Sequence, residues 1–343
     1  MRRQRNFAGG VSVVVAGVSL LAMRALAQDC PKLVGQLPYG PAFAIAVSGG
    51  RAYLGSGAGL LVLDVSGPAA PLMLGGVALP EVVQGVAVAG SYAYVADDVA
   101  GLRVVDVSDP ATPVEVGFNY AADGAQGVAV AGSYAYVACS NTVFPGGSLR
   151  VVDVSNPAAP VEGGSYYMLG YAEGVAVAGA YAYVVGDFGL RVVDVSNPAA
   201  PVEVGFYYTP GYAEGVAVAG AYAYVAARWA GLRVVDVADP TAPVEVGFVD
   251  TQGRALGAAV AGSYAYVADY DYGLRVVDVS DPSAPVEVGF YDTQGGASDV
   301  AVAGGYVHLA DGSAGLAVFL ECGVLFMDGF EFGDTSAWSA TVP

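Results

Sequence analysis

The sequence predicts an all-β protein, a seven-bladed β-propeller with four short strands in each blade. Three observations predict it. A block of about 42 residues recurs along the chain, each copy holds four apolar runs separated by turn residues, and the two chain ends hold complementary parts of one further copy. Glycine makes up 49 of the 343 residues and charged residues only 13%, a composition that favours strands and turns over long helices or disorder.

The repeat reads GVAVAGSYAYVAD, then GLRVVDVSDP, then APVEVGF, with small variations. One aspartate marks its period, at spacings of 42, 47, 41, 42 and 42 residues. These aspartates are Asp64, Asp106, Asp153, Asp194, Asp236 and Asp278. A seventh copy follows at the same spacing with Leu320 in the aspartate's place. This period is typical of propeller blades, and no apolar period of 3.6 residues indicates helical repeats.

The second copy illustrates the four strands that we expect, over 86–89, 92–96, 102–107 and 114–118. Gly90 and Ser91 form the tight turn between the first two strands, and Pro110 and Pro113 lie before the fourth strand, where a proline costs no ladder hydrogen bond. The runs are apolar on both faces, which fits blades packed against a neighbour on each side.

The chain ends predict how the ring closes. Residues 31–35 match the fourth strand at 285–289, yet no first three strands precede them. The seventh copy has three strands over 300–320 and no fourth. The N-terminal strand should therefore complete the last blade.

Charged pairs support this assignment. Five copies carry an arginine on the third strand and a glutamate on the fourth, which predicts cross-strand ion pairs. The pairs are Arg103 with Glu115, Arg150 with Glu162, Arg191 with Glu203, Arg233 with Glu245, and Arg275 with Glu287. The first copy has Leu61 and Met73 there, and the joined ends give the equally apolar Ala317 and Leu33.

Cysteines agree with the closure. Cys322 ends the third strand of the last copy and Cys30 begins the N-terminal strand, so the two lie on either side of one tight connection. We expect a disulfide there, in an oxidising compartment. Cys139 is left over and is expected to be a buried small hydrophobe.

The motifs GLRVVDVSDP, LLVLDVSGP and LRVVDVSNP resemble the LVIVD-repeat family of secreted bacterial β-propellers, over about residues 31–322. The resemblance implies an extracytoplasmic propeller without an established enzymatic activity. It carries over no functional residue, because the matching motif is structural: the aspartate should accept amide hydrogen bonds from the turn that follows it.

Three segments are expected. Residues 1–27 read as a cleaved signal peptide, with Arg2, Arg3 and Arg5 before an apolar run and a small-x-small site at 25–27. Residues 28–322 form the propeller. Residues 323–343 form a C-terminal tail, either a sorting signal, a disordered end or the first strand of a truncated domain. The mature protein should be secreted, at the cell surface or in the periplasm.

Charge limits the partners. Without the four arginines of residues 1–27, nine basic residues remain against 32 acidic ones, a formal charge of −23. Nucleic acid and anionic membranes are therefore excluded as partners. No later stretch reaches 18 apolar residues without turn residues, so we expect no membrane insertion of the mature chain, which should be a monomer.

No catalytic motif is present. GxSxG, HExxH, CxxC and phosphate-binding loops are all missing. The single histidine, His308, stands in the second strand of the last copy, where we interpret it as structural and as a replacement for an apolar residue. We therefore expect no enzyme and no cofactor.

Aromatic residues gather in two kinds of connection that share one face of a propeller. Candidates for a ligand-binding face between the fourth and first strands are Tyr120, Tyr167, Tyr171, Tyr208, Tyr212 and Tyr291, and between the second and third strands Phe188, Trp229, Tyr270 and Tyr272. They suit stacking on sugars or contact with a protein, or they shield blade edges.

One residue precedes each first strand at the channel mouth. In blade order these residues are Phe43, Gln84, Gln126, Glu173, Glu214, Leu256 and Ser298. Gln84, Gln126, Glu173 and Glu214 predict a polar arc. Nearby acids offer calcium an oxygen-rich site, although no ligand spacing of a known kind is present. These acids are Asp97, Asp98, Asp187, Asp269, Asp271 and Asp311.

The leading hypothesis is a non-catalytic binding or adhesion scaffold for an extracellular protein or glycan, acting through the aromatic loops. A structural spacer without a ligand is the first alternative. A hydrolase or lyase acting at the channel mouth is the second.

Overall fold

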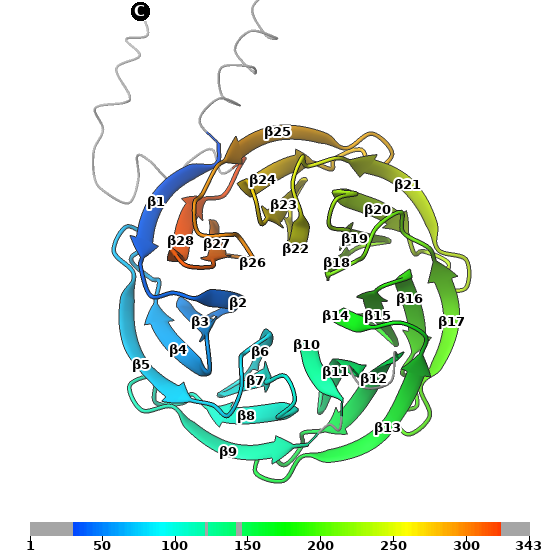
Figure 1. Ribbon diagram of the computed structural model, residues 1–343, viewed down its shortest axis with the longest axis horizontal. Coiled ribbons are helices and arrows are strands. Elements are labelled where there is room, and N and C mark those ends of the chain that lie inside the picture. The colour runs from blue at the N-terminus through cyan, green and yellow to red at the C-terminus, as the bar shows by residue number, and fades with distance from the viewer. Residues whose placement is uncertain (1–29, 121–122, 142–145, 324–343) are drawn as a thin grey trace, which may run out of the picture.

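The computed structural model describes residues 30–120, 123–141 and 146–323 as seven four-stranded antiparallel sheets arranged in a ring (Figure 1). The predicted all-β seven-bladed propeller is confirmed. The candidate signal peptide and the tail beyond Gly323 lie outside the described residues.

The blades are numbered 1 to 7 around the ring, in the order in which their innermost strands occur in the sequence (Figure 1). Blade 1 contains β2 (Ala42–Ser48), β3 (Arg51–Ser56), β4 (Gly59–Asp64) and β5 (Leu72–Ala78). Blade 2 contains β6 (Gly85–Ala89), β7 (Tyr92–Ala96), β8 (Leu102–Asp106) and β9 (Val114–Asn119). Blade 3 contains β10 (Gly124–Ala131), β11 (Tyr134–Asn141), β12 (Gly146–Asp153) and β13 (Val161–Met168). Blade 4 contains β14 (Ala172–Ala178), β15 (Tyr181–Gly186), β16 (Gly189–Asp194) and β17 (Val202–Tyr207). Blade 5 contains β18 (Gly215–Ala219), β19 (Tyr222–Ala226), β20 (Leu232–Asp236) and β21 (Val244–Val249). Blade 6 contains β22 (Ala255–Ala261), β23 (Tyr264–Asp269), β24 (Gly273–Asp278) and β25 (Val286–Tyr291). Blade 7 contains β26 (Asp299–Ala303), β27 (Tyr306–Asp311), β28 (Gly315–Leu320) and β1 (Lys32–Leu37).

The third strand ends one residue earlier than the sequence predicts. In β8 the carboxylate of Asp106 accepts the amide of Ser108 at 2.8 Å, and the amide of Val107 binds the carbonyl of Ser91 at 2.9 Å. The other five repeat aspartates accept the amide two residues later in the same way. The aspartate therefore starts the turn, as expected.

The core lies between blades. Each cluster of buried side chains in the described residues draws on two adjacent blades, including one that joins blade 7 to blade 1 through Leu316, Val318 and Leu54. Because both faces of a blade are covered, its strands are apolar on both sides, as the sequence indicated.

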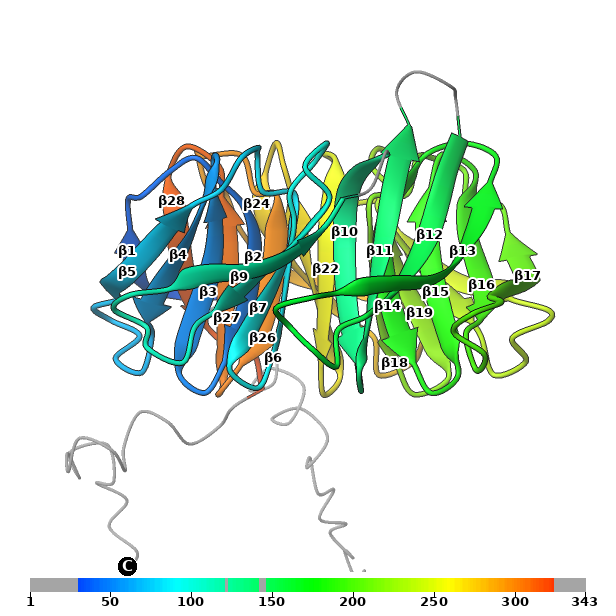
Figure 2. The ribbon, with the colours of Figure 1, turned by 90° about the horizontal axis from the view of Figure 1, so that it is seen from below.

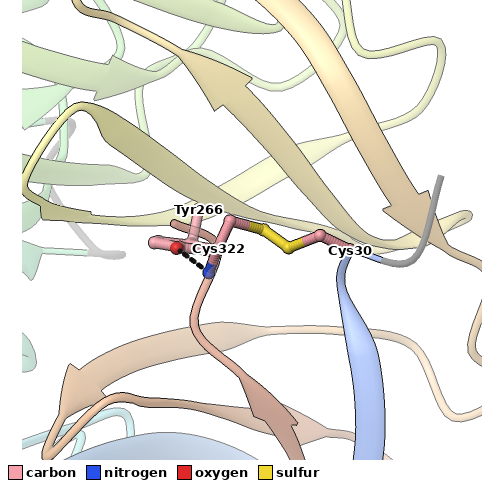
Figure 3. Close-up of a disulfide and its surroundings, with 3 residues drawn as sticks. All are labelled: Cys30, Tyr266 and Cys322. Carbon is pink, nitrogen blue, oxygen red and sulfur yellow. Dashed lines mark hydrogen bonds between the residues drawn. A yellow bond between two sulfur atoms is a disulfide. The ribbon is translucent and has the colours of Figure 1, made fainter. Parts of the chain in front are cut away.

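The predicted closure of the ring is confirmed. β1 pairs with β28, where Leu33 lies opposite Phe319, and Cys30 forms a disulfide with Cys322 across a Cα–Cα distance of 5.8 Å (Figure 3). The phenol oxygen of Tyr266 accepts the amide of Cys322 at 2.8 Å. This hydroxyl replaces the repeat aspartate, whose position is occupied by Leu320.

All five predicted arginine–glutamate pairs form, at distances from 2.7 Å for Arg191 with Glu203 to 3.7 Å for Arg275 with Glu287. They are diagonal rather than directly opposite. A β-bulge shifts the register, so Arg191 faces Phe206 while Glu203 faces Val193. Each guanidinium of blades 2, 4, 5 and 6 consequently also lies over a phenylalanine ring, at 4.4 to 5.0 Å from the ring centroid.

Candidate functional site

The strand register places two sets of connections on one face of the ring. In blade 2, Gly85 pairs with Ala96, Ala96 with Leu102, and Leu102 with Asn119. The start of the first strand, the end of the second, the start of the third and the end of the fourth therefore share one edge of the blade. We call this edge of the ring the loop face; the side view in Figure 2 shows connections leaving the ring at both edges.

A central pocket of about 440 Å³ lies at the channel mouth. Its lining includes one residue from each blade: Phe43, Gln84, Gln126, Glu173, Glu214, Leu256 and Ser298. These are the seven positions that the sequence placed at the mouth, so the expected polar arc has the expected location. Whether the arc binds a ligand is a separate prediction.

A second cavity of about 400 Å³ adjoins the first, and we call it the side cavity. It is lined by Tyr171, Glu173, Asp187, Tyr212, Glu214 and Arg228. Glu173 and Glu214 border both spaces. The structure thus brings together residues from the first strands and loops of blades 4 and 5.

Arg228 organises one wall of the side cavity. Its guanidinium forms an ion pair with Glu214 and lies 5.3 Å from the centroid of the Tyr212 ring. The backbone of Arg228 is left-handed, with φ of 43°, and two hydrogen bonds of 3.0 and 3.1 Å to Ala255 hold it there. Sequence reasoning missed Arg228, whose only signal was a basic residue in a loop of an acidic chain.

Among the charged side chains that line the side cavity, that of Glu173 has no partner in the described residues. Its carboxylate makes no hydrogen bond or ion pair with any residue in the described ranges. Burial raises the pKa of Glu173 to about 7, the negative charges of Glu214 and Asp187 add to the rise, and Arg228 opposes it.

Asp299 is a second acid that sequence reasoning missed. It lines the central pocket at the position where Gly85 stands in blade 2, and its Oδ2 accepts the amide of Ile45 in blade 1 at 2.9 Å. Burial raises the pKa of Asp299 to about 6, against the hydrogen bonds from the Ile45 and Val300 amides. The signal was the change from GVAVAG to DVAVAG in the last repeat.

The aromatic candidates do not all line one cavity. Tyr171 and Tyr212 line the side cavity and Tyr270 lines the central pocket. The remaining candidates line neither space: Tyr120, Tyr167, Phe188, Tyr208, Trp229, Tyr272 and Tyr291. Trp229 is 69% exposed, and Arg254 lies between it and Tyr270, at 5.6 and 4.1 Å from the two ring centroids.

Two of these assignments to loops are wrong. Tyr167 belongs to β13 and Tyr291 to β25, both outer strands. Tyr291 is half-buried and packs edge-on against Phe319, with ring centroids 5.1 Å apart. Tyr207 occupies the same strand position and donates its hydroxyl to Glu245 of the next blade at 2.5 Å. In blade 7 Leu33 stands in the place of that glutamate, so the Tyr291 side chain packs on the Phe319 ring and does not donate a hydrogen bond to a carboxylate.

The acids considered for calcium bind protein groups. The carboxylates of Asp97, Asp187 and Asp269 accept amides of Glu81, Tyr171 and Gly253 at 3.2 to 3.3 Å. Asp311 accepts the hydroxyl of Thr293 at 2.6 Å, Asp271 pairs with Arg254, and Asp98 accepts a long hydrogen bond from Gln126. Over the part of the chain that the structure describes, no three acidic, cysteine or histidine side chains are grouped to hold a metal ion.

His308 lies far into the strand core rather than in a cavity. It is 2% exposed in β27, opposite Ala301 and Val318, and burial lowers its pKa to about 4. The core residue that it replaces is a tyrosine, which the equivalent position holds in the other six blades. These tyrosines are Tyr53, Tyr94, Tyr136, Tyr183, Tyr224 and Tyr266.

The model of the LVIVD repeat matches the chain seven times, at residues 39–78, 82–121, 123–168, 169–209, 210–251, 252–293 and 294–319. The chain belongs to the LVIVD repeat family. No curated protein matches this LVIVD-repeat chain. Within the described residues, the structure contains no helix long and apolar enough to span a bilayer.

Solved structures similar to this LVIVD-repeat propeller share its fold at low sequence identity. The β-propeller domain of Myceliophteria thermophila Cps50 (Swd1) superposes with a TM-score of 0.69 at 11% identity, covering 84% of this chain and 99% of that one. Kuenenia stuttgartiensis hydrazine synthase gives 0.65 at 17%, covering 84% and 97%. The computationally designed Ika8 protein gives 0.62 at 8%, covering 84% and 99%.

Proposed function

We propose that this protein is an exported, non-catalytic binding scaffold that holds an extracellular protein or glycan on its loop face. The observation that carries the proposal is the pair of adjoining cavities at the channel mouth, of about 440 and 400 Å³, bordered by glutamates and tyrosines. Concave sites with a few converging polar groups are the usual places for ligands. The Cys30–Cys322 disulfide supports an oxidising location outside the cytoplasm.

The experiment is a binding array of glycans and surface proteins, probed with the exported protein in the presence and absence of calcium. A hit should weaken about 30-fold or more when Tyr212→Ala and Trp229→Ala are combined, as expected for exposed aromatic anchors. Leu72→Ala is the control, because Leu72 is an exposed apolar side chain at the start of the outer strand β5, where it pairs with Asp64 at the opposite edge of the blade. Binding that survives the double change but not the control change contradicts the proposed face.

A further inference from the structure

Blades 4 and 5 carry the same ten-residue segment at the channel mouth. GYAEGVAVAG occurs at residues 170–179 and again at 211–220. The two copies place Tyr171 with Glu173 and Tyr212 with Glu214 at equivalent positions on neighbouring blades. All four side chains line the side cavity. The protein therefore offers two versions of one tyrosine–glutamate pair, whose surroundings can be compared.

The version in blade 5 is filled by a cation of the protein itself. Arg228 reaches Glu214 through its Nε and one terminal nitrogen, and its guanidinium lies over the Tyr212 ring. A carboxylate together with a tyrosine face is a favourable environment for a guanidinium, through charge-assisted hydrogen bonds and the ring quadrupole. Blade 5 thus demonstrates which chemical group the pair accommodates.

The version in blade 4 lacks that cation. The loop residue that aligns with Arg228 is Asp187, in a loop that is one residue shorter. Asp187 faces the same cavity and accepts the amide of Tyr171 at 3.2 Å. Glu173 has neither a hydrogen bond nor an ion pair among the described residues.

The charges of the side cavity favour a positive group from outside. Three carboxylates face it, from Glu173, Glu214 and Asp187, against the single guanidinium of Arg228. These are the titratable groups that act on Glu173. Because a half-buried carboxylate without a partner is unfavourable, a ligand cation beside Glu173 gains more free energy than it would at an exposed acid.

We propose that the Tyr171–Glu173 half of the side cavity binds the guanidinium of an arginine side chain presented by the partner. This inference rests on the proposed binding function and names the chemistry of the group recognised. The ligand guanidinium occupies in blade 4 the place that Arg228 occupies in blade 5, between a carboxylate and a tyrosine ring.

The test is a calorimetric or NMR titration of the purified, exported protein with N-acetyl-arginine methylamide. The neutral analogue N-acetyl-citrulline methylamide, which has the same shape, is the control ligand. At pH 8 the arginine compound should bind at least 10-fold more tightly than the citrulline compound. Protonation of Glu173 at pH 6 should weaken arginine binding about 10-fold, because the carboxylate form binds the cation.

Variants separate the site from general charge effects. Glu173→Gln should remove both the preference for arginine and its pH dependence, whereas Glu81→Gln, the same charge change at an exposed loop residue, should leave both intact. Asp187→Arg, which supplies blade 4 with the cation found in blade 5, should abolish binding without lowering the melting temperature. This variant keeps the test decisive if Glu173→Gln folds poorly.

Equal binding of the arginine and citrulline compounds overturns the inference, as does an arginine preference that survives Glu173→Gln. A positive binding array would still stand after either result, although this site would not explain it. The failure of the inference is therefore distinguishable from the failure of the proposed function. A blank array with tight arginine binding would instead limit the protein to small cationic ligands.

Discussion

Single residues of the seventh repeat differ from their counterparts, and neighbouring residues compensate. Leu320 cannot accept the amide two residues later, and the hydroxyl of Tyr266 accepts it in place of the aspartate. His308 replaces a tyrosine, and backbone hydrogen bonds at Ala301 and Tyr306 only partly offset the burial of its ring, which lowers its pKa to about 4. The His308 site is therefore the less well compensated of the two.

The pH dependence of stability should reveal His308. Its folded pKa is near 4 and its ordinary value 6.5, so below pH 6.5 the unfolded chain binds a proton that the folded chain excludes. Its contribution to the free energy of unfolding therefore falls by up to about 3 kcal/mol between pH 6.5 and pH 4. Urea denaturation of the parent and of His308→Tyr, the residue of the other blades, measures the difference.

Comparison of the parent with His308→Tyr is needed because several carboxyl groups change the free energy of unfolding with pH in the opposite direction. Burial raises the pKa values of Asp97 and Asp299 to about 6, so the folded protein binds protons that the unfolded chain releases, and their contribution increases as the pH falls. Both proteins share these groups. A constant stability difference across this pH range would contradict the assignment.

Some residues of the site could be predicted from the sequence and others could not. The location of Glu173 and Glu214 at the channel mouth could be predicted from the repeat register alone. The contact between Arg228 and Glu214 does not, because it depends on a left-handed backbone at Arg228 and on hydrogen bonds to Ala255 of the next blade. Nothing in the local sequence specifies that conformation.

At the scale of strands, the fourth strand carries a glycine whose reason lies in the next blade. A Cβ added at Gly117 would overlap the carbonyl of Pro157 in the turn of blade 3. The same overlap recurs around the ring, with Gly289 against the carbonyl of Cys30 as the member that includes the N-terminal segment. Blade spacing is therefore set partly by the absence of a side chain.

Gly117→Ala should destabilise the protein by about 1 to 3 kcal/mol, because the backbone of the neighbouring turn must move to admit a methyl group. The urea midpoint measures the loss. Gly67→Ala is the matched control, since Gly67 has no heavy atom within 4 Å of the added Cβ and no left-handed φ. Equal midpoints for the two variants would show that the contact does not fix the blade spacing.

The arginine–glutamate pairs invite a double-mutant cycle. Blade 1 has leucine and methionine at these positions, which supplies the template Arg191→Leu with Glu203→Met. The arginine change alone should cost about 1 to 2 kcal/mol, since it leaves Glu203 half-buried without its cation, and adding Glu203→Met should recover most of that loss.

The cycle is measured by urea denaturation in a Tyr166→Phe background, because the hydroxyl of Tyr166 donates to the same carboxylate at 2.5 Å. Additive losses, with no recovery in the double variant, would show that the pair is not coupled. The pairing itself was predictable from the sequence. Its diagonal geometry was not predictable, because the β-bulge that creates it does not show in the length of the repeat.

At the scale of the whole molecule, the fold was predictable because the repeat period, the turn residues and the two incomplete ends all specify the same ring. The core needed no further information, since each blade buries the same residues against its neighbour. Among the described strands, only β1 is joined to its own blade by no chain connection, and the disulfide supplies a covalent link between its start and the end of β28.

Reduction of the disulfide should lower the free energy of unfolding, by up to about 5 kcal/mol if the closed loop acts only on the entropy of the unfolded chain. Urea midpoints with and without dithiothreitol measure the loss in the parent protein. The combined variant Cys30→Ser and Cys322→Ser should have a lower midpoint than the oxidised parent, close to that of the reduced parent, and should not respond to dithiothreitol. A parent midpoint that does not respond to the reductant would contradict this role of the bond.

The bond between Cys30 and Cys322 also determines how the ring responds to a mechanical load. The two residues are 292 positions apart in the chain and 5.8 Å apart in space. Tension applied through the segments before Cys30 and after Cys322 passes across the sulfur atoms and bypasses every blade. The oxidised propeller therefore transmits force between its ends as a short rigid link, and its loop face keeps its shape while the chain is pulled.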